Sequence, residues 1–177
     1  MNRLSVRFRR LCVIVAVLVS ALSVSSCMVT YKLNGASIDY AVIKTLSIET
    51  FANRAAYQWG PMAPMFNNTI SDVYNKQTKL RQVKKDGDLQ LSGEITAYDQ
   101  INKSVSADGY SSMVQLKMTV KVKYRNNKHH EDDFEKSFTA TREYDSSQQL
   151  AAVQEQLVQE MIDDIVDQVF NATVANW

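Results

Sequence analysis

The sequence predicts an α+β fold, a two-layer sandwich in which a four-stranded, mainly antiparallel sheet carries two helices on one face. Three observations predict it. Apolar and polar residues alternate with a period of two in three consecutive segments between 89 and 144. Apolar residues recur with the 3.6-residue period of a helix in 61–80 and in 147–171. The expected order is strand, helix, three strands of an antiparallel meander, helix, with both apolar helix stripes on the same sheet face.

The first 26 residues are predicted to be a lipoprotein signal peptide. Four arginines near the start precede an apolar run from Leu11 to Val24. This run of about 14 residues is typical of a signal peptide and shorter than the ~20 residues that cross a bilayer. Small residues then stand directly before Cys27, as in a bacterial lipobox. Cleavage there would leave Cys27 carrying acyl chains such as palmitate, which hold a protein on a membrane; the alternative is an ordinary secretory signal followed by a chance cysteine.

The expected domain organisation is a signal peptide at 1–26, a lipid anchor and tether at 27–40, and a single α+β domain at 41–177. The signal carries four of the 20 Lys+Arg and none of the 19 Asp+Glu, so the mature chain would have 16 basic and 19 acidic residues and a net charge of −3. This balance argues against a nucleic-acid-binding protein. Only two cysteines exist, and the anchor uses the second, so no disulfide or thiol site is expected.

The first strand is expected at 43–51, where Leu46 and Ile48 share one face. Pro61 suits the first turn of a helix, which is predicted to continue to Leu80. The apolar stripe of this helix consists of Met62, Met65, Phe66, Ile70, Val73, Tyr74 and Leu80.

Three strands follow. The strand at 89–101 is expected to point Leu89, Leu91, Gly93, Ile95 and Ala97 inward. A polar connection at 102–112 leads to the strand at 113–125, whose even-numbered residues are apolar and whose odd-numbered residues are polar. An asparagine-rich turn precedes the strand at 134–144, which is predicted to point inward with Phe134, Phe138, Ala140 and Tyr144. The last helix is expected at 147–171, with acidic residues and glutamines on its outer face.

A row of cations on the strand at 113–125 is the strongest candidate for a binding site. Alternate residues of a strand project from the same face about 6.6–6.8 Å apart, which would suit several phosphate groups. The alternative is a solvated strand face that opposes aggregation. The candidate residues are Lys117, Lys121, Lys123 and Arg125, with Lys128 beyond the end of the row.

No catalytic residue, metal site or cofactor is predicted. His129 and His130 are adjacent in one polar turn, beside acidic residues, and no further ligands have metal-site spacing. No nucleophile motif or phosphate-binding glycine loop is present. Tyr57, Trp59 and Phe66 gather around Pro61 and would form either a lip for a partner or a hydrophobic staple at the helix start.

Six segments of the chain together carry a family resemblance. They are residues 47–55 (SIETFANRA), 87–98 (GDLQLSGEITAY), 120–124 (VKVKY), 133–138 (DFEKSF), 145–148 (DSSQ) and 174–177 (VANW). In this order they resemble the Bacteroidetes branch of the LptE family of outer-membrane lipoproteins. The resemblance implies a non-enzymatic subunit of the lipopolysaccharide translocon, with four strands and two helices. Such a subunit plugs an LptD-type β-barrel in the outer membrane, helps that barrel assemble, and binds lipopolysaccharide.

Within that family, basic residues on a strand edge or turn are implicated in lipopolysaccharide contact. The resemblance maps this role onto Lys121, Lys123 and Arg125. The expected location is the outer membrane, held by the N-terminal lipid, with the domain in the periplasm or the barrel lumen. Two other hypotheses remain: a free-standing envelope lipoprotein that binds a ligand or a secretion-apparatus partner, and, less favoured, an envelope enzyme.

Overall fold

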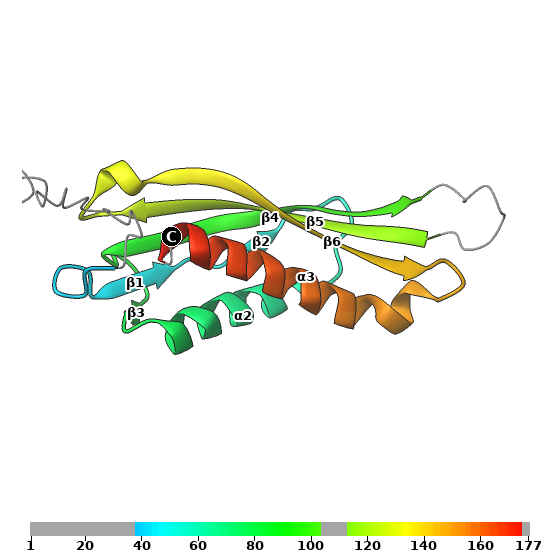
Figure 1. Cartoon of the computed structure of the whole chain (residues 1–177), viewed down its shortest axis with the longest axis horizontal. Helices are drawn as coiled ribbons and strands as arrows, with labels where there is room; N and C mark the ends of the chain where they lie inside the picture. Colours follow the sequence, from blue (N-terminus) through cyan, green and yellow to red (C-terminus); the bar gives the residue numbers. More distant parts are fainter. Residues whose placement is uncertain (1–37, 104–112, 175–177) are drawn as a thin grey trace, which may run out of the picture. The chain divides into compact units, whose positions relative to one another are not determined.

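The computed structural model describes residues 38–103 and 113–174 (Figure 1). They form one mixed sheet of six strands, with two long helices on one of its faces. The elements in chain order are β1 (Thr45–Ile48), β2 (Ala52–Asn53), α2 (Met62–Gln77), β3 (Arg81–Val83), β4 (Leu89–Asn102), β5 (Met113–Asn126), the 3-10 turn η1 (His130–Asp132), β6 (Phe134–Asp145) and α3 (Leu150–Thr173).

The expected α+β class with two helices is confirmed, but the four-stranded, mainly antiparallel sheet is wrong in detail. The strand order is β3-β1-β4-β5-β6, and β2 pairs with β4 off this path. Strands β4, β5 and β6 form the expected antiparallel meander. Strand β1, however, lies parallel to β3 and to β4, and β2 is also parallel to β4. The two unexpected strands, β2 and β3, have two and three residues, which is too short for a period-two pattern.

Strands β3 and β4 flank β1, so the connection at 84–88 must cross β1 to join them. Gly87 lies directly on the β1 backbone, where an added Cβ would meet the Ser47 nitrogen at 2.5 Å and the Leu46 carbonyl carbon at 2.8 Å. The preceding Asp86 has a φ of 56°. The crossing therefore depends on a residue without a side chain at position 87.

Asp88 fastens the end of this crossing to the start of β1. Its carboxylate accepts hydrogen bonds from the backbone N–H groups of Lys44 (3.0 Å) and Thr45 (3.1 Å) and from the Thr45 hydroxyl (2.9 Å). These donors, the Lys44 N–H foremost, lower the pKa of Asp88 to about 2.

The core lies between the helices and the sheet. The even-numbered residues of β5 from Val114 to Tyr124 are all buried, which confirms the predicted alternation. Strand β4 departs from the expected pattern because a bulge between Ile95 and Ala97 shifts its register. As a result Tyr98, and not Ala97, is buried.

Helix α2 ends earlier than predicted. Thr78 is extended, and its hydroxyl donates to the Tyr74 carbonyl at 2.7 Å, so Leu80 is buried outside the helix on the way to β3. Near the middle of α2, the Asn67 side chain bonds both backbone groups of Phe51 in the connection between β1 and β2. The helices meet where the Tyr74 ring packs edge-on against Phe170 at 5.2 Å.

Helix α3 is fixed to the edge strand β6 by Arg142. The guanidinium lies 2.9 Å from the Glu160 carboxylate and 2.7 Å from that of Asp164. These carboxylates, Asp164 foremost, raise the pKa of Arg142. Neither helix of the described part of the chain has the length and hydropathy needed to cross a bilayer.

Candidate functional site

The predicted cation row lies on the outer face of the sheet, opposite the helices, and acidic side chains of the neighbouring strands surround it. Lys121 forms an ion pair with Glu135 of β6. Lys117 stands opposite Asp99 of β4 in the strand register, and Lys121 opposite Glu94. Four cations of β5 therefore share this face with four carboxylates: Glu94, Asp99, Asp133 and Glu135.

These pairings limit how much positive charge the row offers. Arg125 lies 3.9 Å from Asp133, and Lys128 lies 3.1 Å from Asp88. Glu135 raises the pKa of Lys121, and the lysine in turn lowers the pKa of Glu135. Within the described residues, only Lys117 and Lys123 of the five candidates form no ion pair. An anionic ligand would have to displace carboxylates from the other three cations.

The two histidines lie at the hairpin between β5 and β6. His129 Nδ1 is 3.4 Å from Glu131, and His130 Nδ1 is 3.4 Å from Asp133. Across residues 38–103 and 113–174, no group of three or more His, Cys, Asp and Glu side chains is arranged to hold a metal ion. The hairpin therefore offers two separate contacts, each between one histidine ring and one carboxylate.

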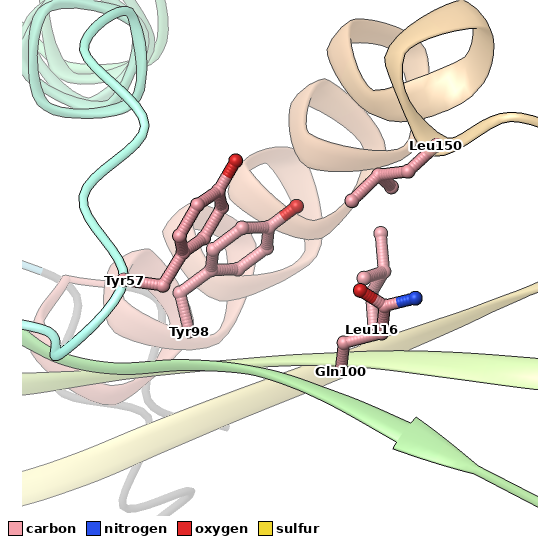
Figure 2. Close-up of a pocket in the computed structure, with 5 residues that line it drawn as sticks. All are labelled: Tyr57, Tyr98, Gln100, Leu116 and Leu150. Atoms are coloured by element: carbon pink, nitrogen blue, oxygen red, sulfur yellow. The ribbon is translucent and has the colours of Figure 1, made fainter.

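A pocket of about 320 Å³ lies on the helix side of the sheet (Figure 2). The Tyr57 and Tyr98 rings stack along one wall, with centroids 5.6 Å apart and an interplanar angle of 24°. Leu150 from the first turn of α3 and Leu116 from β5 form the opposite side. Gln100 completes the lining, and none of these five residues is charged.

Hydrogen bonds hold the polar groups of this pocket in place. The Tyr98 hydroxyl accepts from the Gln154 amide of α3 at 3.1 Å, and the Gln100 amide donates to the Tyr144 hydroxyl at 2.8 Å. Burial raises the pKa of Tyr98, so its hydroxyl stays protonated. Tyr57 is 51% exposed, as a lip residue would be.

Sequence reasoning missed this pocket. Its residues come from four separate segments, and the β4 bulge decides that Tyr98 points into it. The aromatic cluster around Pro61 was the available signal, and the structure divides that cluster. Tyr57 lines the pocket, whereas Phe66 is fully buried and packs on Phe51 at 5.0 Å.

Comparison with known proteins decides the family. The family model LptE, described as lipopolysaccharide-assembly, matches residues 43–173. This range begins at Ile43, the first buried residue of the core, and ends at Thr173, the last residue of α3. The chain belongs to the LptE family. No curated protein matches this LptE-family chain.

Solved structures of other proteins share the fold. A minor lipoprotein from Acinetobacter baumannii is 18% identical, with a TM-score of 0.53, over 76% of this chain and 95% of the other. A hypothetical protein from Chlamydia trachomatis is 12% identical, with a TM-score of 0.51, over 76% of this chain and 99% of the other. At these identities the likeness concerns the fold alone.

Proposed function

We propose that this LptE-family chain is a lipid-anchored subunit of the outer-membrane lipopolysaccharide translocon. In this role the domain occupies the lumen of an LptD-type β-barrel, helps that barrel assemble, and aids insertion of lipopolysaccharide at the cell surface. The family match over residues 43–173 carries the proposal, because it spans every buried core residue of the described chain except Val174. The chain acts by binding, without catalysis or a cofactor.

The N-terminal segment supplies the membrane attachment in this proposal. Residues 1–26 are removed as a signal peptide, Cys27 carries the lipid, and 27–40 tether the domain at 41–177. Cys27 lies outside the described residues, so this step rests on the lipobox pattern.

The outer face of the sheet supports a plug role. A barrel lumen is polar and wet, so a plug needs a polar exterior around its own core. The face that carries Lys121 and Glu135 has balanced charge, with side chains that extend into solvent. Such side chains can replace their present hydrogen-bond and ion-pair partners with groups of a lumen wall at a small cost in free energy.

Lipopolysaccharide contact is proposed on the same face. Lys117 and Lys123 are the first phosphate ligands in this proposal, because no ion pair with the described residues has to be broken. Lys121, Arg125 and Lys128 contribute only when a phosphate displaces Glu135, Asp133 or Asp88.

The experiment that tests the translocon role is an affinity purification of the tagged full chain from detergent-solubilised envelopes, with partners identified by mass. Recovery of a stoichiometric large β-barrel that survives high salt supports the proposal. Recovery of a folded monomer without a barrel refutes it. Lys117→Glu/Lys123→Glu then tests lipopolysaccharide binding by the purified complex. Arg54→Glu/Lys136→Glu is the matched control, because it makes the same change in net charge at two exposed cations outside the row.

The pocket in Figure 2 favours a second function, that of a lipoprotein which binds a small uncharged ligand. Its volume lies near the lower limit of known ligand sites, about 300 Å³. Native mass spectrometry of the chain purified from envelopes tests this function. A co-purifying ligand that Tyr57→Ala removes supports it, and an empty protein that stays monomeric and folded argues against it.

A further inference from the structure

A second set of cations lies at the β3 edge of the sheet. It differs from the outer-face row because its charges are unpaired. Its five members are all exposed: Lys44, Lys79, Arg81, Lys84 and Lys85. None of them forms an ion pair with a carboxylate in residues 38–103 or 113–174. We call this set the β3 patch.

The fold gathers the β3 patch from three places in the chain. The Arg81 N–H donates to the Lys44 carbonyl at 2.9 Å, which joins the start of β3 to the start of β1. The Lys79 amine lies 6.0 Å from the centre of the Tyr40 ring. Lys84 and Lys85 follow β3 directly, and Figure 1 shows β1, β3 and the end of α2 at the same end of the domain.

Exposed apolar side chains adjoin these cations. Tyr40 is 38% exposed and Val42 is 45% exposed, and both lie in the turn that opens the described domain. This turn is ordered by its own hydrogen bonds. The Asp39 carbonyl accepts from the N–H groups of Val42 (3.0 Å) and Ile43 (2.8 Å), and the Asp39 carboxylate accepts from Ala41 N–H (2.9 Å). Tyrosine beside lysine and arginine is the combination found at membrane interfaces.

The same turn lies close to the proposed anchor. Tyr40 is 13 residues after Cys27 in the sequence, a reach of at most about 45 Å for an extended chain. This step rests on the proposed lipid anchor. The tether joins the domain at its first residues. The end of the domain that carries these residues therefore meets the membrane surface more often than the other surfaces do.

We propose that the β3 patch, with Tyr40 and Val42, is a contact surface for the anionic lipid headgroups of the leaflet that holds the anchor. The lysines and arginine attract phosphate-bearing headgroups, and the two apolar side chains enter the interface. The acidic hairpin at η1 reaches the other side of the opening turn, because Glu131 and Asp132 line a pocket with Ile38, Asp39 and Ile43. Three acids also lie at the patch itself: Asp39 in the opening turn, Asp86 directly after Lys85, and Asp88, which pairs with Lys128. The five cations outnumber these three acids, so the patch keeps a net positive charge.

The proposal is tested on the mature chain from residue 27 with Cys27→Ser, which carries no lipid. The described core lies within residues 43–174, so this chain retains it whole. Co-sedimentation is measured with vesicles of phosphatidylcholine mixed with phosphatidylglycerol, and with phosphatidylcholine alone. Because the mature chain has 16 basic and 19 acidic residues, its net charge predicts repulsion from the anionic vesicles. We expect binding to these vesicles only, and weaker binding at high salt.

Two double variants identify the surface. Lys84→Gln/Lys85→Gln removes two patch cations and is expected to weaken vesicle binding about 25-fold, at about five-fold per cation. Arg54→Gln/Lys136→Gln removes two exposed cations that belong neither to the patch nor to the outer-face row, and it should leave binding unchanged. Tyr40→Ser should weaken the binding that remains at high salt. Far-UV circular dichroism verifies that each variant is folded.

Three outcomes overturn the proposal. The first is equal binding to both vesicle types, and the second is an equal loss for the two double variants. The third is full vesicle binding by Lys84→Gln/Lys85→Gln together with loss of the barrel in the affinity purification, which would assign the patch to a protein partner. The vesicle assay needs neither the lipid nor the barrel, so its failure is distinguishable from failure of the translocon role.

Discussion

Asn67 is expected to contribute more to stability than any other polar side chain of α2, because it satisfies the backbone of another segment. Its amide oxygen accepts from the Phe51 N–H at 2.8 Å, and its amide nitrogen donates to the carbonyls of Phe51 (3.0 Å) and Ala63 (2.7 Å). Phe51 is 0% exposed. Asn67→Ala would therefore leave an N–H and a C=O of Phe51 without partners.

The magnitude follows from these two groups. Each unsatisfied buried backbone group costs about 1–3 kcal/mol, and alanine in place of asparagine returns up to about 0.7 kcal/mol in helix propensity. Asn67 is only half-buried, so water reaches part of the site. We expect Asn67→Ala to lower the free energy of unfolding by roughly 2–3 kcal/mol.

Urea denaturation followed by circular dichroism measures this loss as a lower midpoint at unchanged slope. Asn68→Ala is the matched control, because Asn68 is exposed on the same helix, and this variant should show only the small propensity gain. Asn67→Asp retains an acceptor for the Phe51 N–H but no donor, so it should also destabilise. If Asn67→Ala unfolds at the same midpoint as Asn68→Ala, the structural role of Asn67 is refuted.

Three further changes test other parts of the fold. Gly87→Ala should destabilise by about 1–3 kcal/mol because its Cβ would overlap the β1 backbone; unchanged stability in urea would contradict the crossing of β1. Arg142→Met should cost about 1–2 kcal/mol by thermal unfolding, since it separates β6 from Glu160 and Asp164, whereas Arg125→Met should cost almost nothing. Asp88 has a lowered pKa, so the stability that its ionised carboxylate contributes is complete above about pH 4 and is lost as pH falls through about 2. Asp88→Asn should remove the loss of stability that protonation of Asp88 causes in this range. If the variant and the unchanged chain lose stability identically with falling pH, Asp88 does not contribute.

The long elements could be predicted from the sequence because one face of each is continuously buried. Strand β5 alternates over its whole length, and α3 buries one stripe from Val158 to Val169. In such elements the period of the apolar residues and the period of the backbone agree over many turns or pairs. Local pattern then decides the structure with little help from tertiary contacts.

The sheet edge could not be predicted for the opposite reason. Strands β2 and β3 are held by pairing with β4 and β1, and they contain too few residues to show a period. The parallel arrangement depends on the crossing at 84–88, whose local signal is a turn around Gly87 that would equally suit a hairpin. The inward position of Tyr98 depends on a bulge that alternation alone does not reveal.

The two sets of cations show why charge in a sequence does not by itself locate a binding surface. Alternation on β5 places Lys121 and its neighbours on one face, and the sequence indicates this correctly. Whether those charges are free depends on which carboxylates stand beside them, and that is decided by the register of β4 and β6. The β3 patch shows no periodicity because its residues come from the chain before β1, the connection between α2 and β3, the three-residue strand β3 and the bend after it. None of its five cations forms an ion pair within the described residues, whereas three of the five outer-face candidates do. We therefore expect the surface with the weaker sequence signal to attract an anionic partner more strongly.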